Sequence, residues 1–352
     1  MTGPGDGVTG PGDGVTRPGD GVTDPGDGVT DPGDGGTPPE LPRHGLGTAP
    51  IAGLYEAVGE EQARATIDAA WSHGVRLFDT APHYGLGLSE RRLGAALAGR
   101  TGYVLSTKVG RLLRPSGRAG RPGARDDQGF DVPADHERVW DFSRDGVRRS
   151  LEDSLARLGL PRVDIALIHD PDDHMEEALA RAYPALAELR EQGVVGAIGV
   201  GMNQWRAPLR FVQETGIDVV MLAGRYTVID QSGLPLLDAC LERGVRVLAA
   251  GVFNSGLLAT SPPSGTFDYR PAPAAVLERA RRVAAVCEAH GVALPQAAMA
   301  FPLRHPAIAS VVVGARSPEE VAANAALQRR PVPADLWAEL EAEGLLPQSE
   351  KA

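Results

Sequence analysis

Four residues of types that transfer protons stand at the ends of three apolar segments. They are Asp79 and Tyr84 in FDTAPHYG, Lys108 in LSTK, and His169 in VDIALIH. A free tyrosine has a pKa of about 10, which is too high for a good base near neutral pH. A nearby ammonium stabilises the phenolate and lowers that pKa, a carboxylate keeps the ammonium charged, and an imidazole orients a substrate oxygen. The set predicts an acid/base device for hydride transfer, in which an oxygen gains or loses a proton.

Each of the four also has an ordinary structural interpretation when it is taken alone. An aspartate at a strand end commonly caps a turn or a helix. A tyrosine commonly packs with its hydroxyl in water, a lysine commonly marks a solvated strand end, and a histidine is commonly held by structural hydrogen bonds. Their order along successive strands favours a shared site, because the carboxyl ends of barrel strands converge on one face.

Short apolar runs alternate with segments of helical period from about residue 46 onward. The expected strands are 46–49, 76–79, 103–108, 163–169, 197–200, 219–222, 245–249 and 310–313. The expected helices are 60–73, 89–98, 144–158, 176–191, 206–215, 232–243, 273–290 and 318–327. Continuous apolar strands indicate a parallel sheet that is covered on its outer face. Eight such units predict an α/β fold with a closed (β/α)8 TIM barrel.

An open doubly wound sheet is the alternative architecture. It requires a glycine-rich phosphate turn directly after the first strand. The nearest candidate, Gly85-Leu86-Gly87, follows the second expected strand and lacks the third glycine. The barrel is therefore the favoured prediction.

Residues 3–37 repeat with a period of seven, as in GPGDGVT. Proline lacks an amide donor and glycine adds backbone entropy, so the period does not indicate a coiled coil. We expect a disordered tail over residues 1–42, followed by a barrel domain with a C-terminal helix over residues 43–352. Residues 111–143 form a long insertion rich in Arg, Gly, Pro and Asp. At the end of a strand this insertion should overhang the active-site face.

Composition excludes several classes of function. The net charge is -11, which argues against nucleic acid as a partner. The two cysteines, Cys240 and Cys287, are too few for a disulfide framework and are expected to be buried. No apolar run approaches the roughly 20 residues of a membrane span, and no secretory signal is evident. We therefore expect a cytoplasmic protein without a membrane partner.

A metal-dependent barrel hydrolase is a further alternative. The run HDPDDH at 169–174 offers possible ligands. It is expected to lie on one loop without partners on other strands, so no metal site is predicted.

Four segments resemble the aldo-keto reductase family: FDTAPHYG, LSTKVGR, RSLEDSLARLGLPRVDIALIHDPDD and VVVGARSPEEVAANA. The resemblance runs from about residue 46 to residue 327. It implies that Tyr84 is the proton donor or acceptor, that Lys108 tunes it, and that Asp79 pairs with Lys108. It also implies that His169 orients the substrate oxygen and that a nicotinamide cofactor lies extended across the C-terminal face of the barrel.

Further segments resemble the bacterial aldose dehydrogenases of this family, which oxidise L-fucose and other D-threo sugars at C1 to the lactone. They are VWDFSRDGVRRSLEDSLARLGL, LIHDPDDH, GAIGVGMNQW, MLAGRYTVID and AAGVFNSGLLA. The resemblance implies hydride transfer between the nicotinamide and C1 of an aldose. The alternatives are a reductase of aldehydes or pyridoxal on the same site and a catalytically weak regulatory barrel. The expected partner is a small sugar or aldehyde, bound by a monomer or a homodimer.

The resemblance also implies a set of cofactor contacts. They are Asn203, Tyr226, Phe253, Ser255, Gly256, Leu257, Gly314, Arg316, Ser317, Glu320 and Asn324. The start of the helix after the last strand supplies free amides for phosphate. The chain departs from many family members at Gly201-Met202-Asn203, at Ala223 and at Ala250, where Phe253 is the candidate substitute for a stacking aromatic ring. Trp140, Phe142 and Asn254 are the candidate substrate contacts, since aromatic faces stack on sugar C–H groups and amides bond hydroxyls.

Glu320 decides the expected choice of cofactor. NADP-preferring members commonly carry a basic residue at this position, which contacts the 2′-phosphate. A carboxylate repels that phosphate and accepts hydrogen bonds from a ribose diol. The sequence therefore predicts NAD as the preferred cofactor and NADP as the second choice. Arg316 could offset this preference, because its guanidinium can reach a phosphate or stack on adenine.

Overall fold

The computed structural model describes residue 1, residue 3 and residues 39–347. Eight parallel strands close into a barrel in the order β1-β12-β9-β8-β7-β6-β3-β2. Their bounds are β1 His44–Gly47, β2 Leu77–Asp79, β3 Val104–Val109, β6 Val163–His169, β7 Val195–Met202, β8 Val219–Ala223, β9 Arg246–Ala250 and β12 Ile308–Gly314. The predicted (β/α)8 barrel is confirmed, and the open sheet is not formed.

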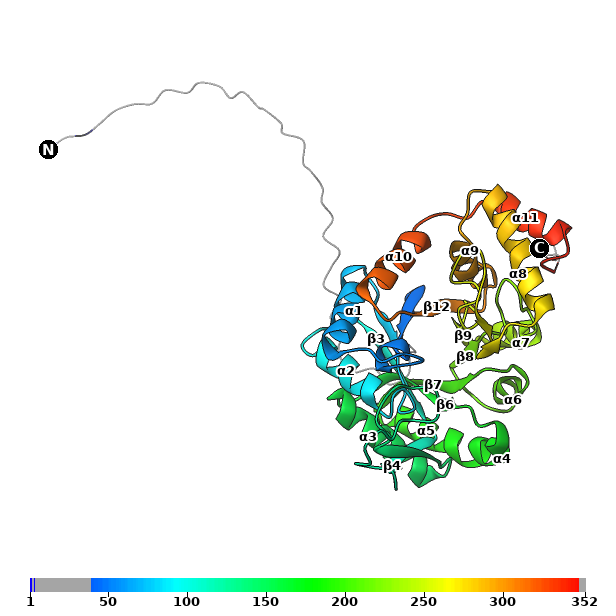
Figure 1. Cartoon of the computed structure of the whole chain (residues 1–352). Coiled ribbons are helices and arrows are strands. Elements are labelled where there is room, and N and C mark those ends of the chain that lie inside the picture. The colour runs from blue at the N-terminus through cyan, green and yellow to red at the C-terminus, as the bar shows by residue number, and fades with distance from the viewer. Residues whose placement is uncertain (2, 4–38, 348–352) are drawn as a thin grey trace. The chain divides into compact units, whose positions relative to one another are not determined.

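Helices surround the ring of strands (Figure 1). Their bounds are α1 Glu60–Ser72, α2 Leu88–Leu97, α3 Arg144–Leu158, α4 Met175–Glu177, α5 Tyr183–Glu191, α6 Arg206–Glu214, α7 Leu234–Arg243, α8 Ala274–Ala289, α9 Leu294–Ala300, α10 Pro318–Gln328 and α11 Ala334–Ala342. Several end in a left-handed glycine, as α3 does at Gly159 with φ 68°. None of the described helices is long and apolar enough to cross a membrane.

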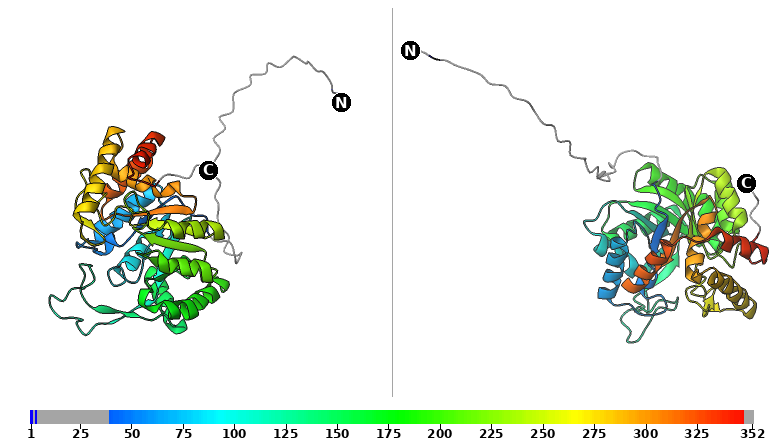
Figure 2. Two further views of the ribbon diagram at one scale, coloured as in Figure 1. Left: turned by 90° about the vertical axis from the view of Figure 1, so that its right-hand side faces the viewer. Right: turned by 90° about the horizontal axis from the view of Figure 1, so that it is seen from above.

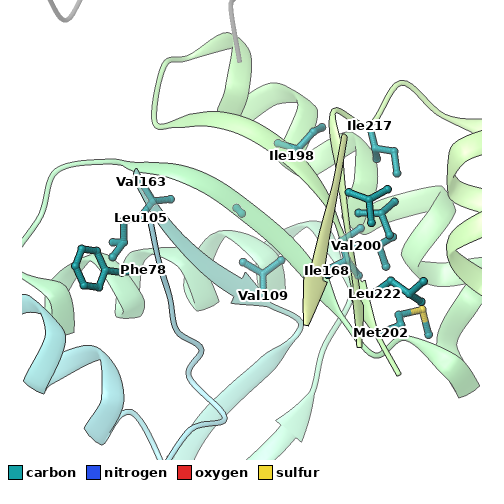
Figure 3. Close-up of a cluster of buried hydrophobic side chains, with 14 of the residues drawn as sticks. Phe78, Leu105, Val109, Val163, Ile168, Ile198, Val200, Met202, Ile217 and Leu222 are labelled. Atoms are coloured by element: carbon teal, nitrogen blue, oxygen red, sulfur yellow. The ribbon is translucent and has the colours of Figure 1, made fainter. Parts of the chain in front are cut away.

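The alternation of side chains along each strand divides the core into two layers. Phe78, Ile168, Val200 and Leu222 point outward and pack beneath the helices (Figure 3). The neighbouring positions point inward and fill the barrel with Leu77, Val104, Ile165, Leu167, Ala197, Val219, Met221, Leu248 and Val312. Because the side-chain period is two, polar residues two or four positions further along also point into the barrel, at its C-terminal end.

The insertion after β3 contains an antiparallel hairpin that the sequence did not predict. Strand β4 (Arg111–Pro115) pairs with β5 (His136–Trp140), and the loop between them projects beyond the barrel in the left view of Figure 2. Phe130 and Val132 of this loop pack with Ala52 and Leu86 in a small separate apolar cluster. A second short hairpin follows β9, formed by β10 (Thr266–Phe267) and β11 (Arg270–Pro271).

Other differences from the expected elements are local. Strand β1 begins two residues before the expected start at residue 46, and α9 was not expected. Residues 4–38 of the expected disordered tail lie outside the described residues. Contacts with the barrel begin before residue 43, because Arg246 donates a hydrogen bond to the carbonyl of Pro39.

Candidate active site

The predicted catalytic group meets inside the C-terminal end of the barrel. Asp79 follows the inward Leu77 by two residues, Lys108 follows Val104 by four, and His169 follows Leu167 by two. Parallel pairing of β2 with β3 and of β3 with β6 brings these strand ends together. Tyr84 reaches the same place from the loop that connects β2 to α2.

The ammonium of Lys108 is the centre of the group. Its Nζ donates to Asp79 at 2.9 and 2.7 Å, to the carbonyl of Thr80 at 3.0 Å and to the Tyr84 hydroxyl at 3.0 Å. Lys108 is 2% exposed and Asp79 is 3% exposed. The contacts show the pairing of Asp79 with Lys108, and of Lys108 with Tyr84, that the sequence predicted.

Burial and charge act in opposite directions on this group. Burial alone lowers the pKa of Lys108, but the Asp79 carboxylate and the Tyr84 oxygen more than reverse this, so the pKa is raised and the amine stays charged. Burial raises the pKa of Tyr84 to about 12, although the Lys108 ammonium lowers it. Lys108 acts in the expected direction, but the net shift is upward. At neutral pH Tyr84 is therefore a phenol, ready to donate a proton.

His169 is a neutral imidazole in this site. Burial lowers its pKa well below 6.5, and the nearby Arg111 and Lys108 lower it further. The ring meets the Tyr84 ring edge-on at 6.1 Å between centroids. Its Nδ1 is buried and has no hydrogen-bond partner among the described residues. A neutral imidazole beside the phenol can hold a substrate oxygen without adding charge.

His83 is a site residue that the sequence reasoning missed, although it directly precedes Tyr84 in FDTAPHYG. Its ring centroid lies 5.7 Å from that of His169 and 6.0 Å from that of Tyr84. Burial lowers the pKa of His83 to about 2, with Arg111 and Arg138 lowering it further. The C-terminal end of the barrel therefore carries two neutral histidines.

The insertion holds the loop that carries His83 and Tyr84. Arg138 of β5 donates to the carbonyl of His83 at 2.8 Å and forms an ion pair with Asp126 at 2.6 Å. The two side chains of this pair are only 4% and 3% exposed. Phe130 meets the His83 ring edge-on at 5.3 Å. The insertion therefore does more than overhang the site, since it fixes the backbone beside Tyr84.

A cleft of about 450 Å³ lies beside Asp170, the residue that follows His169. Its lining residues come from the start of β4, the end of β5 and the segments that follow β6 and β7: Arg111, Trp140, Asp170, Asp172, Asp173, His174, Asn203 and Gln204. Trp140 is 43% exposed, which suits the substrate contact expected of it. The guanidinium of Arg111 lies 4.2 Å from the centroid of the Trp140 ring and pairs with Asp170.

Phe142 takes a different place from the one expected. It is fully buried, and its ring stacks on the inner side of Trp140 at 5.8 Å between centroids. Gly110 makes this possible, because a Cβ at that position would lie 2.2 Å from Cε1 of Phe142. Phe142 is thus a packing residue that supports Trp140, and the structure does not support the substrate contact expected of it.

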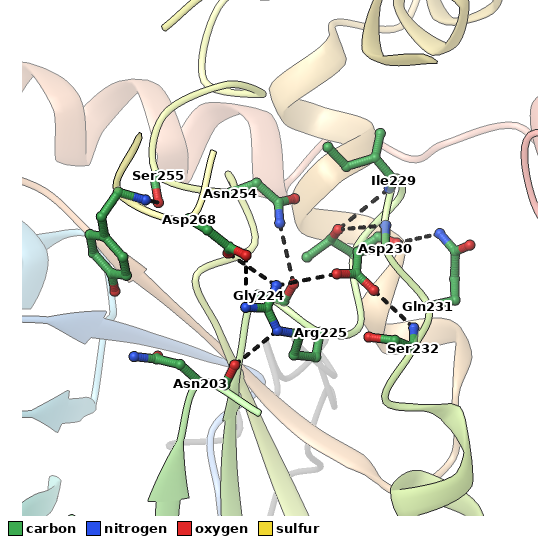
Figure 4. A network of polar contacts seen from close by, with 12 residues as sticks. Asn203, Gly224, Arg225, Ile229, Asp230, Gln231, Ser232, Asn254, Ser255 and Asp268 are labelled. Carbon is green, nitrogen blue, oxygen red and sulfur yellow. Dashed lines mark hydrogen bonds and ion pairs between the residues drawn. The ribbon is translucent and has the colours of Figure 1, made fainter. Parts of the chain in front are cut away.

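Asn254 is also buried, at 3% exposure, and it joins two loops (Figure 4). Its Nδ2 donates to the carbonyl of Gly224 at 3.3 Å, while its Oδ1 has no partner among the described residues. Asn254, Ser255 and Gly256 have φ values of 46°, 59° and 101° in succession. Ser255 Oγ accepts a hydrogen bond from the amide of Tyr269 at 3.1 Å. Asn254 does not line the cleft, so its expected substrate contact is not supported.

Arg225 ties three loops together at the mouth of the barrel, as Figure 4 shows. It donates to the carbonyl of Asn203 at 2.8 Å and to both carboxylate oxygens of Asp268 at 3.0 and 2.8 Å. A further ion pair links it to Asp230 at 3.3 Å. The side chain of Asn203 remains exposed in the cleft, where the sequence expected a cofactor contact.

Three other expected cofactor residues turn toward the core. Leu257 is fully buried in the cluster around α8 and α9. Tyr226 packs against the ring of Phe301 at 5.0 Å, and Phe253 is half-buried between the two main clusters. Leu257 therefore offers no exposed side chain to a cofactor, whereas Tyr226 and Phe253 remain half-buried.

The segment from β12 into α10 presents its polar groups at the surface. Gly314 is exposed at the end of β12, and Asn324 is half-buried on α10. The hydroxyl of Ser317 accepts a hydrogen bond from the amide of Glu320 at 3.2 Å, which caps the helix. A carboxylate oxygen of Glu320 accepts from the amide of Arg316 at 2.9 Å.

Arg316 lies between two carboxylates. Its Nη1 pairs with Glu56 at 3.0 Å, and its Nε lies 3.6 Å from Glu320. Its carbonyl accepts a hydrogen bond from Gln62 at 2.9 Å. The guanidinium is thus already engaged by groups of opposite charge.

Comparison with known proteins agrees with this geometry. Residues 44–343 match the Aldo/keto reductase family. The chain is 45% identical to D-threo-aldose 1-dehydrogenase of Pseudomonas sp over 87% of this chain and 95% of that protein. It is 41% identical to pyridoxal 4-dehydrogenase of Microbacterium luteolum over 86% of this chain and 94% of that protein. An aldo-keto reductase from Bacillus halodurans, in its holo form, superposes with a TM-score of 0.67 at 24% identity over 86% and 92% of the two chains.

Proposed function

This chain belongs to the aldo-keto reductase family, and on that premise we propose that it oxidises C1 of a D-threo aldose, such as L-fucose, with NAD. The family makes it an oxidoreductase that uses a nicotinamide cofactor. The observation that carries the proposal is the 3.0 Å contact between the Lys108 ammonium and the Tyr84 hydroxyl inside the barrel mouth. The relative that is 45% identical over nearly its whole length supports an aldose as substrate.

The residues at the barrel mouth fit a dinucleotide. The positive end of the α10 dipole, together with Arg316 and Ser317, suits a phosphate group. The exposed carboxamide of Asn203 suits the nicotinamide amide, and the buried Asn254 Oδ1 is an acceptor without a partner among the described residues. When bound, the nicotinamide supplies the acceptor for the hydride that leaves C1.

The side chains of the site handle the proton of this reaction. His169 holds the hydroxyl on C1 by a hydrogen bond from its neutral ring. Tyr84 takes the hydroxyl proton as the hydride departs, and Lys108 stabilises the phenolate that this requires. Asp79 keeps Lys108 charged at 2.7 Å. In the reverse direction the Tyr84 phenol donates its proton to the aldehyde oxygen.

The preference for NAD rests on Arg316. A 2′-phosphate would have to draw its guanidinium away from Glu56 and would face the carboxylate of Glu320. A ribose diol instead finds two acceptors there. Both carboxylates therefore support NAD over NADP.

A substrate panel tests the proposal. The purified chain is mixed with NAD and L-fucose, D-arabinose, L-galactose or pyridoxal, or with NADH and a simple aliphatic aldehyde, and absorbance is followed at the reduced nicotinamide band. Oxidation of the sugars is expected, and it should vanish in Tyr84→Phe while the cofactor still binds. Activity on aldehydes alone, or wild-type turnover in Tyr84→Phe, would refute the proposal.

Pyridoxal is the second candidate substrate, because the relative at 41% identity is a pyridoxal 4-dehydrogenase. The same catalytic group serves both substrates, so the relative kcat/KM values in the panel decide between them. We further propose a cytoplasmic monomer or homodimer, which cell fractionation and size-exclusion chromatography test.

A further inference from the structure

The cleft beside His169 carries an excess of negative charge, which bears on the substrate of the proposed reaction. Its lining includes one guanidinium, that of Arg111, and three carboxylates, those of Asp170, Asp172 and Asp173. Asp172 and Asp173 are exposed, and Asp172 accepts a hydrogen bond from Gln204 at 3.2 Å. An anion entering the cleft would therefore meet these two carboxylates at its open side.

The cations near Tyr84 offer little compensation, because each already has a carboxylate partner. Lys108 pairs with Asp79, and Arg138 pairs with Asp126. Arg111, whose side chain is 9% exposed, pairs with Asp170. Removing a charge from such a buried pair leaves its partner uncompensated, which is unfavourable. An anionic substrate would thus gain no free cation among the described lining residues.

Arg111 nevertheless retains a donor for an uncharged group. Its Nε is buried and has no hydrogen-bond partner among the described residues. The side chain lines the cleft, and its guanidinium lies 4.2 Å from the centroid of the Trp140 ring. A donor beside an aromatic face, with carboxylate acceptors opposite, matches the hydroxyl and C–H groups of a neutral sugar.

We propose that this cleft receives the hydroxylated end of the substrate remote from C1, and that Asp172 and Asp173 exclude substrates phosphorylated there. The inference rests on the proposed function and deepens it: the enzyme acts on free sugars and not on sugar phosphates. Like charges at short range repel strongly in a partly enclosed site.

L-Galactose and L-galactose 6-phosphate provide the matched test. L-Galactose differs from L-fucose by a hydroxyl on C6, and a phosphate at C6 leaves the pyranose ring free to form. The expected ratio of kcat/KM for the free sugar over the phosphate is at least 100 in the wild type. In Asp172→Asn/Asp173→Asn this ratio should fall at least tenfold.

A control variant separates the local from the global effect of charge. Glu152→Gln/Asp153→Asn removes the same two charges from the exposed side of α3, away from the cleft, and should keep the wild-type ratio. Equal use of both sugars by the wild type would overturn the inference. An unchanged ratio in the cleft variant would also overturn it, as would an equal fall in the control.

If the chain does not oxidise aldoses, the same measurements give a result that differs from failure of the phosphate exclusion. If neither sugar is oxidised but pyridoxal is, the aldose assignment fails. The exclusion is then judged on the ratio of kcat/KM for NADH-dependent reduction of pyridoxal over that of pyridoxal 5′-phosphate with the same variants, because reduction of the free aldehyde needs no ring closure through the C5′ hydroxyl that the phosphate blocks. A fall in that ratio in the cleft variant alone supports the exclusion, and equal use of the pair overturns it.

Discussion

Replacing both carboxylates that hold Arg316 should shift the enzyme toward NADP. Glu56→Gln/Glu320→Gln removes the partners at 3.0 and 3.6 Å from the guanidinium. Glutamine keeps an oxygen that can accept the hydrogen bond from the Arg316 amide, so the start of α10 is preserved. Arg316 then becomes free to approach a 2′-phosphate, and no carboxylate opposes that phosphate.

The size of the shift follows from the exposure of these groups. The side chain of Arg316 is 34% exposed, that of Glu56 is 72% exposed and that of Glu320 is 48% exposed. Ion pairs this accessible contribute roughly 0.2–1 kcal/mol each. Two pairs together give about 0.4–2 kcal/mol, and a tenfold change in relative kcat/KM corresponds to about 1.4 kcal/mol. The NADP-to-NAD ratio of kcat/KM should therefore rise by roughly two- to thirtyfold, with relief of repulsion favouring the upper end.

Steady-state kinetics at low ionic strength measure this ratio with one sugar and both cofactors. Glu319→Gln is the matched control, because Glu319 lies on the same exposed turn without an ion pair to Arg316 among the described contacts. Its ratio should stay near the wild-type value. A wild-type preference for NADP, or a double variant no different from the control, would refute the reasoning.

Three further predictions concern protons and the insertion. Sugar oxidation should speed up steadily from pH 7 to 10, because Tyr84 must lose a proton and burial raises its pKa to about 12; a flat pH–rate profile would contradict this. Acid should destabilise the fold below about pH 6.5, because the unfolded chain protonates His83 while burial lowers its folded pKa to about 2. Urea titrations should show that the free energy of unfolding falls by up to about 1.4 kcal/mol per pH unit through His83 as the pH is lowered. If the slope of this free energy against pH is unchanged in His83→Gln, the prediction is refuted. Arg138→Met should lower the free energy of unfolding, measured by urea denaturation, by about 3–5 kcal/mol, because it leaves the Asp126 carboxylate buried and unpaired. Asp126→Leu in the same chain should recover most of that loss, and a double variant as unstable as the single would argue against the buried pair.

The barrel and the meeting of Asp79, Lys108 and His169 were predictable because one pattern encodes both. Continuous apolar strands give a parallel sheet, and the period of two decides which side each residue faces. Once Leu77 points inward, Asp79 does too, and the same rule places Lys108 and His169. Chain order then brings the strand ends together.

The sequence pattern said less about the insertion and the short helix α9. The strands RLLRP and HERVW each hold two charged residues among five and are separated by 20 residues, so neither shows an apolar face that predicts pairing. Helix α9 is apolar on nearly all sides and begins Leu294-Pro295, so it lacks the stripe that marks a surface helix. Both elements depend on contacts distant in the chain.

Side-chain placement in the cleft could not be inferred from residue type. Trp140 and Phe142 are both aromatic and two residues apart, yet one is 43% exposed and the other fully buried. The difference arises at Gly110, whose missing Cβ leaves room for the Phe142 ring. A residue more than 30 positions away thus decides which ring can meet a substrate.

The insertion also contributes to the proton affinity of Tyr84. Burial is the largest cause of the raised pKa of Tyr84, and part of that burial comes from Phe130, whose ring lies 6.1 Å away. Arg138 fixes the preceding residue by its bond to the His83 carbonyl. A change in the insertion therefore alters two things at once, the shape of the cleft and the ease with which Tyr84 releases its proton. Substitutions at Phe130 should consequently shift the pH dependence of kcat, a readout that altered substrate binding alone would leave in place.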